Sequence, residues 1–182
     1  MTLVHTFGGI RQIAMVVRDA ESTLRTLTGT LGIGPFYVIR DYVPDDFRYR
    51  GNPSPPPRLT LAFAQSGPVQ VEVIQQHNDV PSAYAEFLAS GREGCQHVAA
   101  WFSDRSAYDA ARDDLLARGW PLVHENGDRS AGPRFAYFAT DLPGALMLEI
   151  AEALVPASRP FVEMIAQAGA SWDGSDPIRT SS

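Results

Sequence analysis

Four polar side chains that are able to bind a metal or move a proton lie in segments that otherwise read as apolar strands. Gln12 and His97 occupy the same position in two similar stretches, each with Gly three residues before and Asp seven residues after, and they are 85 residues apart (97 − 12). Glu72 and Glu149 each follow a Gly by five residues in matching apolar contexts. Because a lone buried carboxylate is costly, its recurrence in both copies of a repeat predicts a shared partner.

If the two copies face one another, Gln12, Glu72, His97 and Glu149 converge on one cavity. One amide oxygen, two carboxylates and one imidazole suit a divalent ion such as zinc, nickel, cobalt, manganese or magnesium. Iron ranks behind these, because non-haem iron oxygenases use two His and one carboxylate, and only one of the four positions is His. Taken singly, each side chain has an ordinary alternative, as a core residue or a surface ion-pair partner.

This ligand set favours redox-neutral Lewis-acid chemistry. A metal that holds two substrate oxygens polarises a carbonyl and stabilises an enolate or enediolate, while a carboxylate beside it abstracts and returns a proton. Glu149 is the first candidate base and Glu72 the second. The expected reaction is an isomerisation, epimerisation or lyase step.

Several residues are predicted to contact a small, oxygen-bearing substrate of hydrophobic or aromatic character. Trp101 and Cys95 share the strand face of His97 if that side chain points inward, and Met147 shares the face of Glu149. Tyr137 is a candidate proton donor or orienter. A long polar loop over 43–57 and its flanks offer Tyr42 and Phe47 as a lid, with packed loop aromatics as the alternative. Arg58 and Arg134 open matching strands and are expected either to bind a carboxylate or, preferably, to pair with surface acids.

The elements that must position these residues repeat as β-α-β-β-β. The first unit has strands over 10–17, 36–42, 58–64 and 69–75, with a helix that begins after Asp19 and ends at Gly32. The second has strands over 95–102, 121–124, 134–139 and 145–151, with a helix between Asp104 and Gly119. We expect an α+β fold with modules at 1–80 and 93–152 and a linker helix in 81–92. A C-terminal helix and an extended tail are expected in 153–182, and only the last residues are expected to fray.

Composition excludes several classes of function. The net charge of −6 argues against nucleic-acid binding, and the apolar runs are too short to span a membrane. Cys95 is the single cysteine, which excludes an internal disulfide and a cysteine zinc cluster. The chain has no Lys, so Schiff-base chemistry by Lys is excluded. With no secretory leader pattern, we expect a cytoplasmic protein.

The two units, the strand openings at Gln12 and His97, and the Gly-x-x-x-x-Glu hairpins resemble the vicinal-oxygen-chelate superfamily, which includes glyoxalase I, methylmalonyl-CoA epimerase, extradiol dioxygenases and bleomycin-resistance proteins. The resemblance covers roughly residues 8–152. It implies a half-barrel of paired modules around a metal, and a homodimer in which modules pair within or between chains. The set Gln–Glu–His–Glu is similar to that of one glyoxalase I branch and departs at two positions from the His–Gln–His–Glu of methylmalonyl-CoA epimerases.

The resemblance implies a metal-dependent, glyoxalase-like isomerase or lyase. Two alternatives stay open. One is a non-catalytic protein of the same fold that sequesters a hydrophobic compound, and the other is a ring-cleaving dioxygenase.

Overall fold

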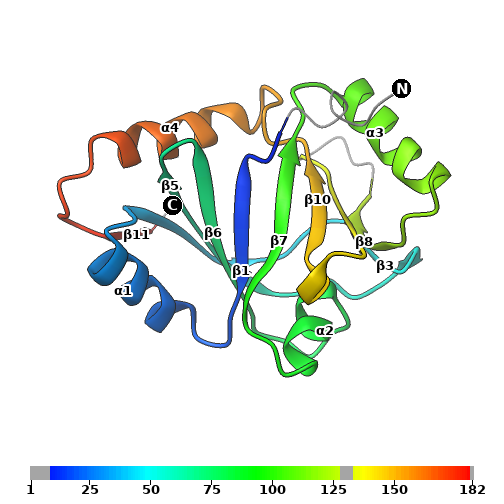
Figure 1. Cartoon of the computed structure of the whole chain (residues 1–182), viewed down its shortest axis with the longest axis horizontal. Helices are drawn as coiled ribbons and strands as arrows, with labels where there is room; N and C mark the ends of the chain where they lie inside the picture. The colour runs from blue at the N-terminus through cyan, green and yellow to red at the C-terminus, as the bar shows by residue number, and fades with distance from the viewer. Residues whose placement is uncertain (1–8, 128–132, 181–182) are drawn as a thin grey trace.

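The chain forms one curved, unclosed mixed sheet with helices on both of its faces (Figure 1). The computed structural model describes residues 9–127 and 133–180. The architecture confirms the predicted α+β fold class. No helix in these described ranges is long and apolar enough to cross a bilayer.

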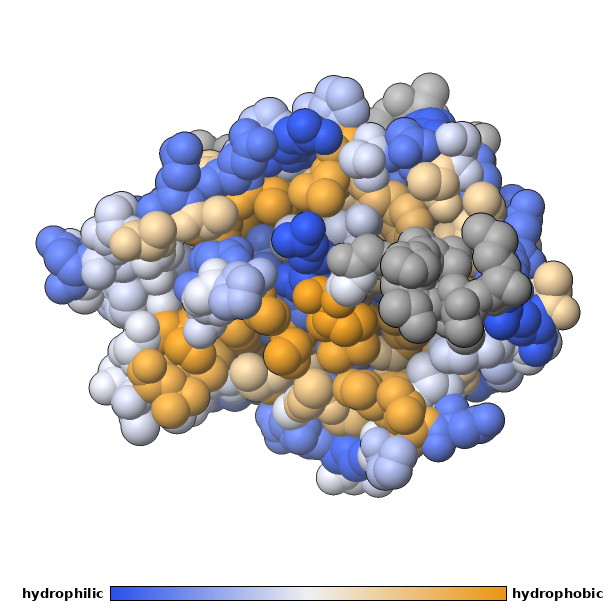
Figure 2. All heavy atoms as spheres, turned by 45° about the horizontal axis from the view of Figure 1, so that its top comes forward, coloured by the Kyte–Doolittle hydropathy of each residue, from blue (hydrophilic) through white to orange (hydrophobic). Residues whose placement is uncertain are grey.

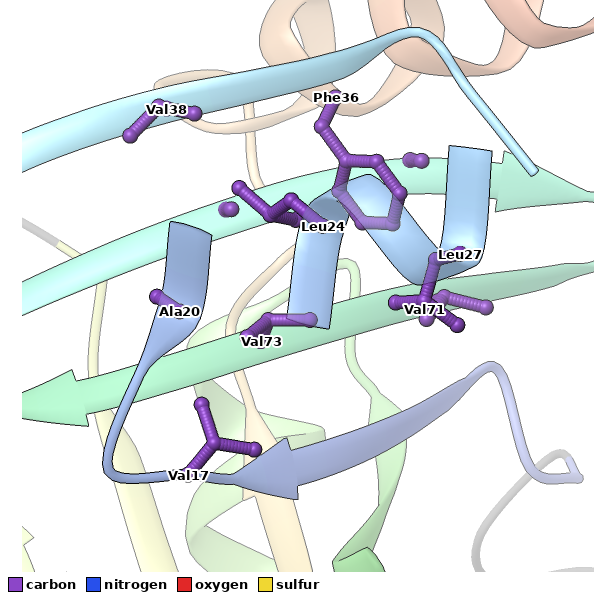
Figure 3. Packing of buried hydrophobic residues seen from close by; sticks show 10 residues of the cluster. Val17, Ala20, Leu24, Leu27, Phe36, Val38, Val71 and Val73 are labelled. Carbon is purple, nitrogen blue, oxygen red and sulfur yellow. The ribbon is translucent and has the colours of Figure 1, made fainter. Parts of the chain in front are cut away.

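The first β-α-β-β-β unit builds one half of the sheet. Its elements are β1 (Gln12–Val16), α1 (Ala20–Leu31), β2 (Phe36–Tyr42), β5 (Leu59–Ser66) and β6 (Val69–Gln76), and its strand order is β2-β5-β6-β1. The Asp19 carboxylate caps α1 by accepting from the backbone N–H of Ser22 (2.9 Å). Leu24 and Leu27 then pack on the outer face of the sheet against Phe36 (Figure 3). Helical spacing of Leu on α1 therefore fixes this layer.

The second unit repeats the arrangement. It contains β7 (Gly94–Trp101), α3 (Arg105–Ala117), β8 (Leu122–Asn126), β9 (Phe135–Phe138), the short 3₁₀ turn η2 (Pro143–Ala145) and β10 (Met147–Ala151). Its strand order, β7-β10-β9-β8, is the counterpart of the first half. The Asp104 side chain caps α3 by accepting from Ala107 N–H (2.9 Å), and Tyr108 and Leu115 of that helix are buried against the sheet.

Strand register explains why the polar residues meet. The antiparallel pair β1–β7 joins the halves, and each of these strands pairs in parallel with β6 or β10. Glu72 lies opposite Ala14 in one half, and Glu149 lies opposite Ala99 in the other. Since side chains alternate along a strand, the equivalent registers direct both carboxylates to the inner face of the curve.

A bulge interrupts the central pair. Ala14 pairs with His97 and Met15 with Cys95, so Gln96 is an extra residue in β7. Gln96 is fully buried and Cys95 is exposed. The prediction that Cys95 shares the inward face of His97 is therefore wrong, because one inserted residue breaks the two-residue alternation.

Two further expectations are corrected at the edges of the sheet. The segment 43–57, predicted as a loop, contains β3 (Phe47–Tyr49) and β4 (Asn52–Pro53), and β3 pairs with β8 of the second unit. The last residues, predicted to fray, include β11 (Ile178–Thr180), which pairs in parallel with β2. β3 and β11 each gain backbone hydrogen bonds from a strand that is distant in sequence.

Two helices lie on the inner face. The helix α2 (Ala83–Ala89) follows the Ser82 cap and buries Tyr84 and Phe87. The helix α4 (Arg159–Ala170) lies beside β5 (Figure 1). These helices, with the sheet, enclose the space in which the polar residues lie.

Candidate metal and active site

Glu72, His97 and Glu149 form a compact buried cluster. Each offers one ligand atom, and these atoms lie within 4.8 Å of one another. His97 Nε2 is 3.3 Å from Glu149 Oε2 and 3.6 Å from Glu72 Oε2. The strands β6, β7 and β10 thus bring together three of the four side chains that the repeat predicted as ligands.

A residue that sequence reasoning missed orients the imidazole. Gln96 Oε1 lies 2.7 Å from His97 Nδ1. The Gln96 amide nitrogen in turn lies 3.3 Å from Met147 Sδ and 3.4 Å from the carbonyl oxygen of Ala83, and it donates to both. Because an amide oxygen only accepts, Nδ1 carries the hydrogen, and Nε2 faces the carboxylates as a ligand would. Gln96 points inward because of the bulge, and no sequence pattern predicts a bulge at this position.

The charges of the cluster fit a divalent cation. Burial raises the pKa of Glu72, as does the charge of Glu149, against the opposing effect of His97. Burial lowers the pKa of His97, but the hydrogen-bonded carboxylates of Glu149 and Glu72 outweigh it and raise that pKa to about 9. Two carboxylates with one imidazole leave an excess of negative charge away from water, which a divalent ion offsets.

Gln12 lies beside this cluster and is buried. Its Nε2 donates to Gln70 Oε1 (2.8 Å), and Gln12, Gln70, Glu72 and Glu149 all line one cavity. Within the described part of the chain, the buried Gln70 Nε2 has no hydrogen-bond partner. Gln70 thereby orients the amide of the fourth candidate ligand, Gln12.

Two tyrosine hydroxyls extend the cluster. The Tyr137 hydroxyl lies 3.3 Å from His97 Nε2, and the Tyr84 hydroxyl donates to the Tyr137 oxygen (3.1 Å). Burial raises the pKa of both phenols well above the usual value, with the nearby carboxylates adding to the effect. Both groups therefore stay protonated, and Tyr137 has a hydrogen to donate at the site. Tyr84 lies on the linker helix and was not predicted.

The cavity has a volume of about 300 Å³. Four of the five predicted substrate-contact residues line it: Tyr42, Phe47, Trp101 and Tyr137. Met147 is not among the lining residues, and its Sδ instead accepts a hydrogen bond from the Gln96 amide. Lining residues that were not predicted include Phe63 of β5 and Phe161 of α4.

The arginines that were candidates for binding a carboxylate are paired within the chain. Arg58 Nη1 bonds Asp41 (2.7 Å) at the surface. Arg134 bonds Glu152 (2.8 Å) and Asp109 (2.7 Å). The prediction that they pair with surface acids is confirmed for Arg58, whereas Arg134 pairs both with the exposed Asp109 and with the fully buried Glu152.

Comparison with known proteins connects this site to a family. The model of the family described as the Glyoxalase/Bleomycin resistance protein/Dioxygenase superfamily matches residues 11–138, which include three of the four predicted ligands and end before Glu149. A search of curated protein sequences found no match.

Solved structures share the fold. Methylmalonyl-CoA epimerase from Mycobacterium tuberculosis is 22% identical, with a TM-score of 0.56 over 84% of this chain and 92% of that one. A hypothetical protein from Bacillus halodurans is 15% identical, with a TM-score of 0.53 over 79% and 93%. A variant of Streptomyces coelicolor methylmalonyl-CoA epimerase in complex with 2-nitronate-propionyl-CoA is 19% identical, with a TM-score of 0.51 over 79% and 92%. At these identities the likeness concerns the fold.

Proposed function

The chain belongs to the glyoxalase/bleomycin resistance protein/dioxygenase superfamily, and on this basis we propose that it is a metal-dependent isomerase, epimerase or lyase that moves a proton next to a carbonyl group. The observation that carries the proposal is the buried cluster of Glu72, His97 and Glu149. It combines a cation-binding donor set with carboxylates that line a cavity of substrate size.

Gln12, Glu72, His97 and Glu149 would hold the divalent ion, which is zinc, nickel, cobalt, manganese or magnesium in this proposal. When bound, such an ion polarises a substrate carbonyl and makes the neighbouring C–H bond more acidic. The remaining roles belong to side chains of the protein. His97 offers Nε2 because Gln96 occupies its other nitrogen.

Glu149 is also the proposed base, a role that it would fill with a carboxylate oxygen not bound to the ion. Its carboxylate lines the cavity, and Tyr137 is its direct neighbour on the adjacent strand. A carboxylate within reach of an acidified C–H bond takes the proton and returns it to the same or the adjacent carbon. Tyr137 supplies a hydrogen-bond donor for an oxygen that gains negative charge during the transfer. Glu72 is the second candidate base, because burial raises its pKa.

The test is exchange of a substrate C–H with deuterium from solvent. Purified protein is analysed for bound metal and incubated in D₂O with 2-hydroxyacetophenone and other small 2-hydroxy ketones, and deuterium is measured by mass spectrometry. We expect exchange above the uncatalysed rate in metal-loaded protein, loss of exchange after chelation, and a decrease of at least about 100-fold in Glu149→Gln.

Two outcomes contradict the proposal. Protein that binds the ketones but contains no metal and gives no exchange is a sequestration protein. Protein that retains iron and consumes oxygen with a catechol is a dioxygenase.

A further inference from the structure

The wall of the cavity next to Glu72 is made of aromatic and aliphatic side chains. Phe63 is the register partner of Glu72 on the adjacent strand. The backbones of these two residues are therefore one strand spacing apart, about 4.8 Å. Leu59 and Leu61 of the same strand also line the cavity. A substrate in which a polar head is bonded directly to a flat apolar group would therefore place the head beside Glu72 and the apolar group against the side chains of β5.

The C-terminal helix α4 completes this wall. The Phe161 ring meets Phe63 edge to face, with 5.6 Å between centroids and 88° between planes, and Val162 also lines the cavity. The helix fits closely against β5, because a Cβ at Gly169 would lie 2.8 Å from the Gln65 Cβ. Hydrophobic side chains also gather in the middle of the face shown in Figure 2. The helix thus closes one side of the cavity with an aromatic ring.

The charges around the cavity disfavour an anionic substrate. Among the lining residues that the structure describes, Arg134 is the one cation, and Glu152 and Asp109 already bond its guanidinium. Glu72 and Glu149 add negative charge at the reacting end. Apart from the proposed metal ion, a phosphate or carboxylate in this cavity would meet acids. The only cation that it would meet among the lining residues in the described ranges is Arg134, which two carboxylates already bond and whose Nε has no hydrogen-bond partner.

We propose that Phe63 and Phe161 form an aryl subsite and that the substrate is a small, uncharged aryl ketone with a second oxygen on the adjacent carbon. The position of the oxygen-bearing head rests on the proposed function, whereas the subsite rests on the aromatic wall. An offset or edge-to-face ring in this place adds to the binding gained from apolar burial.

The test compares two neutral probes with the same head, 2-hydroxyacetophenone and hydroxyacetone, by calorimetry on the metal-loaded protein. We expect the aryl probe to bind at least about tenfold more tightly. Phe161→Ala should weaken the aryl probe about fivefold or more and leave hydroxyacetone unchanged. Met164→Ala, on the exposed side of the same helix, should change neither, and Phe161→Leu keeps apolar volume without a ring if the Ala variant unfolds.

Equal affinities for the two probes, or aryl affinity that is unchanged in both Phe161 variants, would overturn the subsite. Tighter binding of acetyl-CoA than of the aryl probe would do the same. These outcomes are separable from failure of the proposed function. Ring-dependent binding without proton exchange leaves the subsite standing and removes the catalytic proposal, and exchange without ring dependence does the reverse.

Discussion

The contact between Gln96 and His97 makes a quantitative prediction about metal affinity. In Gln96→Met, a side chain of similar volume keeps the packing but removes the oxygen that lies 2.7 Å from His97 Nδ1. His97 is fully buried, so water does not replace the lost acceptor. Loss of such a partner of a metal-binding imidazole typically lowers metal affinity about 10- to 100-fold, or about 1.4–2.8 kcal/mol. We expect the upper half of this range because of the burial.

The assay is competition of zinc and nickel between the protein and a chromophoric chelator at fixed pH. Cys95→Ala is the matched control, because Cys95 is the exposed neighbour of Gln96 on the same strand and its removal also eliminates thiol binding. Thermal unfolding in chelator shows whether the variant is folded. Metal affinity in Gln96→Met within about twofold of the wild type would refute the argument, since the prediction is at least tenfold.

Three further predictions follow from the buried groups. The metal-free protein should lose stability as pH rises through about 9, because the pKa of His97 is raised from 6.5 to about 9 and its contribution is complete below 6.5; a melting temperature that climbs from pH 7 to pH 10 contradicts this. Tyr84→Phe should slow proton exchange about fivefold with little change in KM, since it removes the donor to Tyr137, and an unchanged exchange rate argues against a positioning role. Arg134→Met should lower the free energy of unfolding by about 1.5–3 kcal/mol, because it removes the closest cation from the buried Glu152 and leaves only Arg105 at 3.9 Å among the ion pairs of the described residues. Urea denaturation measures this, and a loss below about 1 kcal/mol speaks against the pairing.

The sequence contained enough to predict the repeat and the four candidate ligands. Gln12 and His97 are equivalent positions in the repeat, and so are Glu72 and Glu149. This correspondence can be read from the sequence because strand alternation and hairpin spacing depend only on nearby residues. A carboxylate in an apolar strand is conspicuous without any knowledge of its neighbours. The homodimer stays a prediction, which light scattering of the purified protein would test.

The missed features depend on contacts between distant parts of the chain. The bulge at Gln96 depends on the pairing of β7 with β1, and local sequence does not encode an extra residue there. Tyr84 meets Tyr137 only because α2 lies on the inner face. Phe161 lies in the predicted C-terminal helix, and its ring is part of the cavity wall only because α4 packs beside Phe63.

The pairing of β3 with β8 has a consequence for how the chain unfolds. A segment from the first unit completes the sheet of the second, and β1 and β7 join the two units at the centre. Cutting the chain in the linker would therefore leave each fragment with an unpaired strand edge, which favours aggregation. We expect hydrogen exchange of the β1 and β7 amides to proceed through one global opening, so that the two halves unfold cooperatively.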